Sequence, residues 1–111
     1  KLLTAPDRRP APAGALDELL AAVRRRSTYA EAALRGELDT VLAARPGNRN
    51  HTLNASAYAL GRLIGAGLLP EQLAEDALLH AGQAIGLGEH ECAATVRSGL
   101  SAGAHHPRAA A

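Results

Sequence analysis

The chain has 111 residues and a formal net charge of +1, with 47% hydrophobic residues, two Tyr and no Phe, Trp or Met. A chain of this length forms one domain with a modest core. That core must consist of Leu, Val, Ile and Ala, which favours closely packed helices over a β-sandwich. The one cysteine, Cys92, excludes an internal disulfide and fits a reducing compartment. No apolar run approaches the ~20 residues that a membrane span needs.

The beginning of the chain predicts a linker. Residues 1–14 combine prolines with charged residues, which is typical of a segment that enters from a preceding domain. The chain does not begin with Met and carries no signal-peptide pattern, so we expect a piece cut from a longer cytoplasmic protein. A helical domain is predicted over residues 15–108, with its core in 28–104, and residues 109–111 are expected to fray.

Apolar spacings of three and four predict four or five short helices. A short helix is expected over 15–26. The second begins with a capping-box pattern at Thr28 and Glu31 and stops at Pro46-Gly47. A central helix follows, and the next has Pro70 in its first turn and reaches about Ile85. The last starts near Glu89 and continues past Gly103.

Glycines recur four residues apart in the last three predicted helices. Glycine inside a helix costs about 1 kcal/mol relative to alanine, so its repeated use suggests that helices approach one another closely there. One member, Gly86, is equally consistent with a C-cap. The prediction is an all-α, compact antiparallel bundle with close glycine-mediated packing. The pairs are Gly61 and Gly65, Gly82 and Gly86, and Gly99 and Gly103.

The entrance of the central helix is the strongest candidate for a binding site. Arg49 lies between Asn48 and Asn50, where free backbone N–H groups and the positive end of the helix dipole attract anions. We expect that anion to be a phosphate of a nucleic acid or nucleotide. The alternative is a structural cap, in which Asn50 bonds the first-turn N–H groups and Arg49 bridges to an acid of a neighbouring helix.

Two more residues of this helix have two interpretations each. Asn54 is unfavourable inside a helix unless its side chain bonds a partner, which is either a ligand or a neighbouring helix. Tyr58 either stacks on a base or packs with its hydroxyl at the rim of the bundle. The surrounding charge favours an anion, since residues 45–69 and 92–111 contain arginines and no acid, whereas 70–91 contain acids and no Lys or Arg.

Three stretches resemble a known family. They are GNRNHTLNASAYALG at residues 47–61, TVRSGLSAG at 95–103 with Pro107-Arg108 behind it, and YAEAAL at 29–34. They are similar, in order and spacing, to the small helical domain that follows the catalytic domain in bifunctional DNA primase/polymerases of bacteria, plasmids and phages. The likeness covers about residues 28–108.

The resemblance implies an accessory role in replication initiation. The domain would help the polymerase hold template DNA, and an initiating nucleotide such as ATP, during primer synthesis. By motif match, Arg49, Asn50 and Asn54 are the first candidate contacts, and Arg97 and Ser98 are the second. The implied partners are the DNA template, the preceding catalytic domain and a replicative helicase. The family's catalytic acids belong to that upstream domain, so this chain is not expected to be an enzyme alone or to carry a cofactor of its own.

Other functions have weaker signals. His90 and Cys92 lack the spacing of a zinc site, and neither a nucleophile triad nor a phosphate-binding Gly-rich loop is present. The main alternative is a protein-docking or oligomerisation module of a replication protein, without DNA contact. That alternative predicts a large exposed apolar patch.

Overall fold

The computed structural model describes residues 13–25 and 27–108, and these form five α-helices and no strand. The prediction of an all-α helical bundle is confirmed. The predicted linker at 1–14 and the predicted frayed tail at 109–111 fall almost entirely outside the described residues. The helices are α1 (Ala13–Arg24), α2 (Thr28–Leu42), α3 (Arg49–Gly65), α4 (Glu71–Ala84) and α5 (Glu89–Ala104). No helix in the described part of the chain is long and apolar enough to cross a bilayer.

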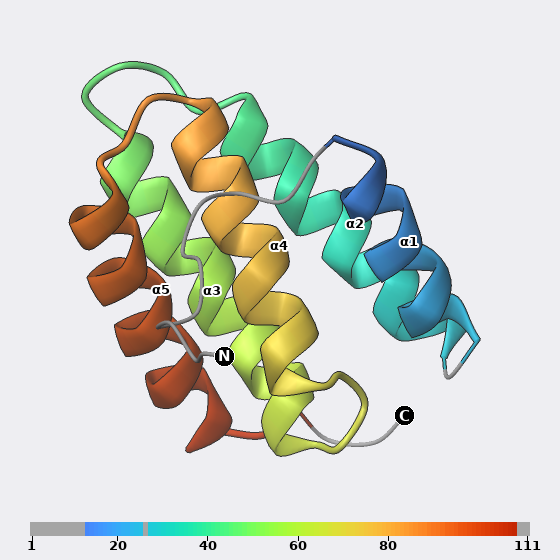
Figure 1. The fold of residues 1–111 in the computed structure, drawn as a ribbon. Helices are drawn as coiled ribbons and strands as arrows, with labels where there is room; N and C mark the ends of the chain where they lie inside the picture. The colour runs from blue at the N-terminus through green and yellow to red at the C-terminus, as the bar shows by residue number, and fades with distance from the viewer. Residues whose placement is uncertain (1–12, 26, 109–111) are drawn as a thin grey trace, which may run out of the picture.

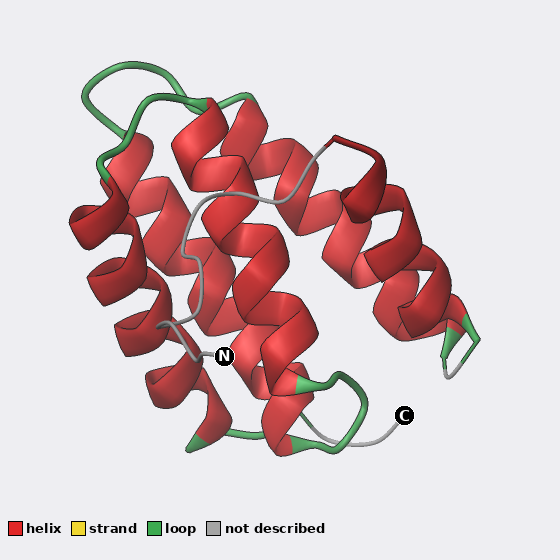
Figure 2. Ribbon diagram, viewed as in Figure 1, coloured by secondary structure: helices red, strands yellow, loops and turns green. Residues whose placement is uncertain are grey.

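Consecutive helices run in alternate directions, as expected for a bundle with short loops (Figure 1). The most extensive packing, however, joins α3 to α5, which are parallel because α4 returns the chain between them. Figure 2 shows the loops that enter α3 and α5 at the same end of the molecule. The positive ends of two helix dipoles therefore lie together at this end.

The core is aliphatic, as the composition predicted. Leucines and valines from all five helices are buried together with small alanines and the thiol of Cys92. Because the aliphatic side chains are short, the helices pack at small separations. The fully buried residues with the largest side chains are Val23, Leu34, Val41, Leu53, Leu60, Leu63, Leu78 and Val96.

Glycines bring α3 and α5 into backbone contact. A Cβ at Gly65 would lie 2.5 Å from the carbonyl oxygen of Ala104, and a Cβ at Gly99 would lie 2.5 Å from the Cβ of Ala57. A Cβ at Gly103 would overlap the carbonyl oxygen of Tyr58. Hence the predicted glycine-mediated packing is present, and it is concentrated in the parallel α3–α5 seam.

The two glycines of the third pair, Gly82 and Gly86, have different roles. Gly82 lies where a Cβ would be 2.6 Å from the sulfur of Cys92, so it permits α4 to approach α5. Gly86 follows the end of α4 with φ of 99°. The N–H of Leu87 donates to the oxygen of Gly82, and the N–H of Gly86 donates to the oxygen of Gln83. These bonds form a Schellman C-cap, which is the alternative that the sequence left open for Gly86.

The start of α2 differs from the expected capping box. Ser27, rather than Thr28, is the N-cap, and its hydroxyl accepts a hydrogen bond of 3.0 Å from the N–H of Ala30. Glu31 consequently lies one position too far along the helix to complete the box. Its carboxylate instead accepts bonds from the guanidinium of Arg35, the closer at 2.7 Å. Adjacent Ser and Thr both suit the N-cap position, and backbone geometry selects between them.

Candidate phosphate-binding surface

The N-terminus of α3 has no capping side chain. The chain enters through Gly47, whose φ is 93°, and Asn48 is the N-cap residue but makes no side-chain capping bond. The carbonyl of Asn48 accepts the N–H of Thr52, which leaves the first-turn N–H groups pointing out of the helix end. No acidic residue lies in this first turn. The positive end of the helix dipole is therefore not neutralised by its own helix.

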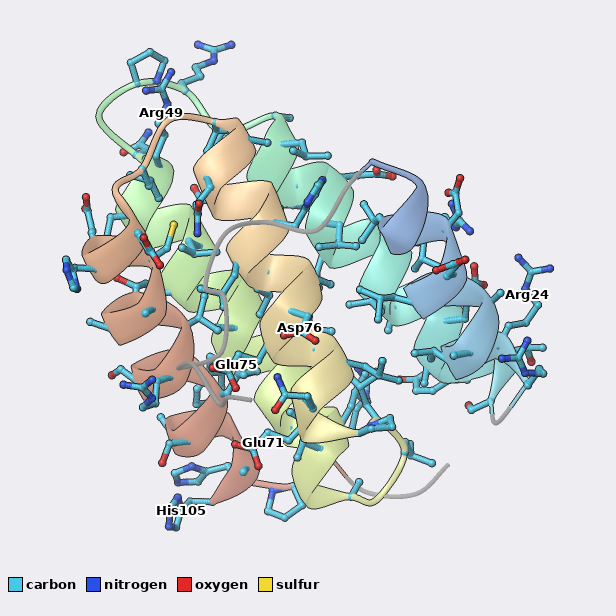
Figure 3. All side chains as sticks on the ribbon, viewed as in Figure 1. Arg24, Arg49, Glu71, Glu75, Asp76 and His105 are labelled. Carbon is cyan, nitrogen blue, oxygen red and sulfur yellow. The ribbon has the colours of Figure 1, made fainter. Side chains whose placement is uncertain are left out.

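Arg49 is the first residue of α3 and lies partly buried at this end of the bundle (Figure 3). Its Nη1 is 3.7 Å from the position that a Cβ would take on Gly86, so the guanidinium lies against the α4–α5 turn. Its Nε is buried and has no hydrogen-bond partner. The ion pairs seen among the described residues both use Glu31, so no described carboxylate pairs with Arg49. The alternative of an Arg49–acid bridge is not what the structure shows.

Polar residues of α3 and α5 line a shallow hollow that begins at Asn50, the residue after Arg49, and Arg49 itself does not line it. Its volume is about 410 Å³. The hydroxyl of Thr95 donates to Oδ1 of Asn50 over 2.5 Å, which links the two helices. The alternative interpretation required the Asn50 side chain to cap its own helix. Its Oδ1 instead accepts the bond from Thr95 of α5. The lining residues are Asn50, His51, Asn54, Ala94, Thr95 and Ser98, and none of them is acidic.

The hollow contains three of the five candidate residues, namely Asn50, Asn54 and Ser98. Asn54 is exposed, and its side chain makes no hydrogen bond to another described residue. An interhelical bond, one of the two alternatives for Asn54, is made by Asn50 instead. Thr95 and His51 were not singled out from the sequence. Thr95 precedes Ser98 by about one helical turn, so both lie on the same face of α5. Only the packing of α5 against α3 shows that this face lines the hollow.

Arg97 lies on the other side of α5. It lines a second hollow, of about 370 Å³, between α4 and α5. Ala94 contributes to both hollows, so Arg97 is next to the polar hollow without lining it. The other residues of this second hollow are Leu79, Gln83, Glu89, His90 and Ala93, and the Nε2 of Gln83 is buried without a hydrogen-bond partner.

Charge is distributed unevenly between the two helices of the seam. α3 contains no Asp or Glu anywhere along its length, whereas α5 has Glu89 and Glu91 in its first turn. Those carboxylates offset the dipole of α5. Burial and the nearby Glu91 both raise the pKa of the Cys92 thiol. A phosphate is therefore favoured on the α3 side of this end and disfavoured near the first turn of α5.

Within the described residues, no group of three or more His, Cys, Asp or Glu side chains is arranged to hold a metal ion. No known protein family matches the chain, and no curated protein or solved structure gives a significant match. Membership of the primase/polymerase family thus stays a prediction from the three similar stretches.

Proposed function

We propose that this helical domain binds phosphate groups of nucleic acid, or of an initiating nucleotide, at the polar hollow between α3 and α5. The observation that carries the proposal is the uncapped, acid-free N-terminus of α3, which begins with Arg49 and continues into the hollow with its amide and hydroxyl groups. Backbone N–H groups, a helix dipole and a guanidinium are the donors that phosphate oxygens bind in proteins.

Each residue has a distinct part in this proposal. Arg49 contributes positive charge, and its Nε donor, which has no partner in the bundle, is satisfied when the side chain turns toward a phosphate. The Asn54 amide and the Ser98 hydroxyl offer neutral donors across the hollow. The Thr95–Asn50 bond holds the Asn50 amide in place. Such contacts are made to the sugar-phosphate backbone, so binding is largely independent of base sequence.

The resemblance extends the proposal to a biological setting. A phosphate-binding helical domain attached to a primase/polymerase catalytic domain would hold template or initiating nucleotide during primer synthesis. A replicative helicase and the catalytic domain are then its protein partners, in the cytoplasm of a bacterial host or in plasmid or phage replication. The chemistry of primer synthesis belongs to the catalytic domain in this proposal.

The test is the binding of a fluorescent single-stranded oligonucleotide, with and without a nucleoside triphosphate, to wild type and Arg49→Ala at about 50 mM and about 200 mM salt. A hydrogen bond to a charged group contributes about 1.5–3 kcal/mol, so the variant should bind at least about 10-fold more weakly. The slope of log affinity against log salt should fall by about 0.7 for each phosphate of the single strand that the variant no longer neutralises.

Arg25→Ala is the matched control, because Arg25 is an exposed arginine at the end of α1, remote from the hollow in sequence and in helix order. It removes the same formal charge and should leave affinity nearly unchanged. Equal binding by wild type and Arg49→Ala would refute the assigned site. A chain that binds no oligonucleotide at low salt but forms a stable dimer would instead support the docking alternative.

A further inference from the structure

Four residues form a continuous stripe along α3. Asn50, Asn54, Tyr58 and Arg62 follow one another at four-residue spacing, which places them on one face of the helix. Asn50, Asn54 and Tyr58 are exposed and Arg62 is partly exposed. The stripe extends about 18 Å at the rise of an α-helix. It therefore continues the polar hollow toward the opposite end of the bundle.

Residues of α5 and the segment after it accompany this stripe over its whole length. Thr95 bonds Asn50, and Ser98 lines the hollow with Asn54. The ring of His106 lies 6.3 Å from the ring of Tyr58.

At the far end, Nε of Arg62 donates to the carbonyl oxygen of His106 over 2.8 Å. The N–H of Arg108 donates to the carbonyl oxygen of Arg62. The segment after α5 is thereby fixed beside α3. The two sides form one surface, which we call the seam strip. It consists of Asn50, Asn54, Tyr58 and Arg62 from α3 with Thr95, Ser98 and His106.

The seam strip is shallow because the glycines bring the two helix backbones into contact beneath it. A shallow surface leaves the Tyr58 ring accessible, and 38% of that residue is exposed. The protein has only two aromatic residues, and the other, Tyr29, lies on α2. An exposed aromatic ring between polar side chains is the arrangement on which unpaired bases stack.

No acidic side chain of α3 or α5 lies within the seam strip. α3 has none, and α5 has none after Glu91 in its first turn. The far end would otherwise be negative, because the C-terminal carbonyls of two parallel helices lie there. His105 and His106 cover carbonyls of α5, since their Nδ1 atoms lie 2.8 Å and 3.2 Å from carbonyl oxygens of its last turn, and Arg62 adds a positive charge beside them through its bond to the carbonyl of His106. From Thr95 to the end of α5, a polyanion can therefore follow the strip without meeting a carboxylate of either helix, and Glu91 lies one turn before Thr95.

We propose that a single strand of nucleic acid lies along the seam strip, with one base stacked on Tyr58 and its phosphates contacting Arg49 at one end and Arg62 at the other. This inference rests on the proposed phosphate-binding function and adds the form of the nucleic acid, its path and its length. A single strand fits because stacking on Tyr58 needs a base that is free of a duplex. At about 3.4 Å per stacked nucleotide, the strip accommodates about five nucleotides.

The first experiment measures the affinity of oligodeoxythymidines from about two to about ten nucleotides long by fluorescence anisotropy. Affinity should rise with length and level off near five nucleotides. Tyr58→Leu should weaken binding of the longer strands by about 5- to 150-fold, the range measured for removal of one base–aromatic stack. Tyr58→Phe keeps the ring and should bind like wild type.

The second experiment adds a negative charge while every side chain of the strip stays in place. Ala102 is exposed on α5 beside the far half of the strip, and Ala32 is exposed on α2. Ala102→Glu should weaken oligonucleotide binding at low salt several-fold, while Ala32→Glu should have little effect. Circular dichroism is used to check that each variant is folded.

The outcomes separate this inference from the proposed function. If Arg49→Ala weakens binding but Tyr58→Leu and Ala102→Glu bind like wild type, the strand does not follow the strip, although the phosphate site stands. A plateau at two nucleotides leads to the same conclusion. If wild type binds none of the strands at low salt, both the strip and the phosphate site are refuted.

Discussion

Replacing Gly103 by alanine should destabilise the bundle, although alanine is the better helix former. The new Cβ would overlap the carbonyl oxygen of Tyr58 and lie 2.9 Å from the nitrogen of Arg62 and 3.0 Å from the Cα of Gly61. All three are backbone atoms of α3, so no side chain can rotate away. The helices must separate, which loosens the whole seam.

The size of this effect follows from two opposing terms. Overpacking a core costs typically 1–3 kcal/mol, and backbone-only contacts place this site at about 3 kcal/mol. Better helix propensity returns about 1 kcal/mol. The expected net loss is about 2 kcal/mol, which lowers the melting temperature of a domain of this size by roughly 8–16 °C.

Gly36→Ala is the matched control for the same chemical change. Gly36 is exposed within α2, and a Cβ there would have no neighbour within 4 Å. This variant should gain up to about 1 kcal/mol of stability. Urea and thermal unfolding of both variants, followed by circular dichroism, measures the difference. A Gly103→Ala protein as stable as wild type would refute backbone contact in the α3–α5 seam.

Two further predictions concern the cap of α2 and the buried thiol. Ser27→Ala should lower the free energy of unfolding by about 1 kcal/mol because it removes the acceptor of the Ala30 N–H. Thr28→Ala should change that free energy little. If urea unfolding shows the larger loss for Thr28→Ala, Thr28 is the cap after all. Cys92 should react with thiol reagents only after unfolding, because it is buried and its pKa is raised above the ordinary 9.0. Since the unfolded thiol ionises first, this group's contribution to stability is complete below about pH 9 and is lost as pH rises further. Urea midpoints of wild type should therefore fall more than those of Cys92→Ala between about pH 8 and about pH 10, and parallel curves would contradict the assignment.

The sequence by itself determined the class of fold and the local features of its helices. Absence of Phe, Trp and Met with many Leu and Ala left only closely packed helices. Apolar residues spaced three and four apart identified the buried face of each helix, because the helix period alone places such residues on one side. The acid-free composition of residues 45–69, and Arg49 at a helix start, were equally visible without coordinates.

Only the tertiary structure decided which helices meet and which side chains share a surface. The glycine pairs predicted close packing, but they did not indicate which helices would meet. In the structure α3 and α5 pack directly against each other and run parallel, because α4 returns the chain between them in sequence. That pairing brings Asn50 to Thr95, residues far apart in the chain.

The rotation of α5 also came from packing. Gly99 and Gly103 face α3, and each helical residue turns about 100° from the last. Ser98 therefore lies at the seam, while Arg97 turns away toward α4. A helix periodicity gives relative angles within one helix, but the absolute direction of each side chain depends on the neighbour against which the helix packs.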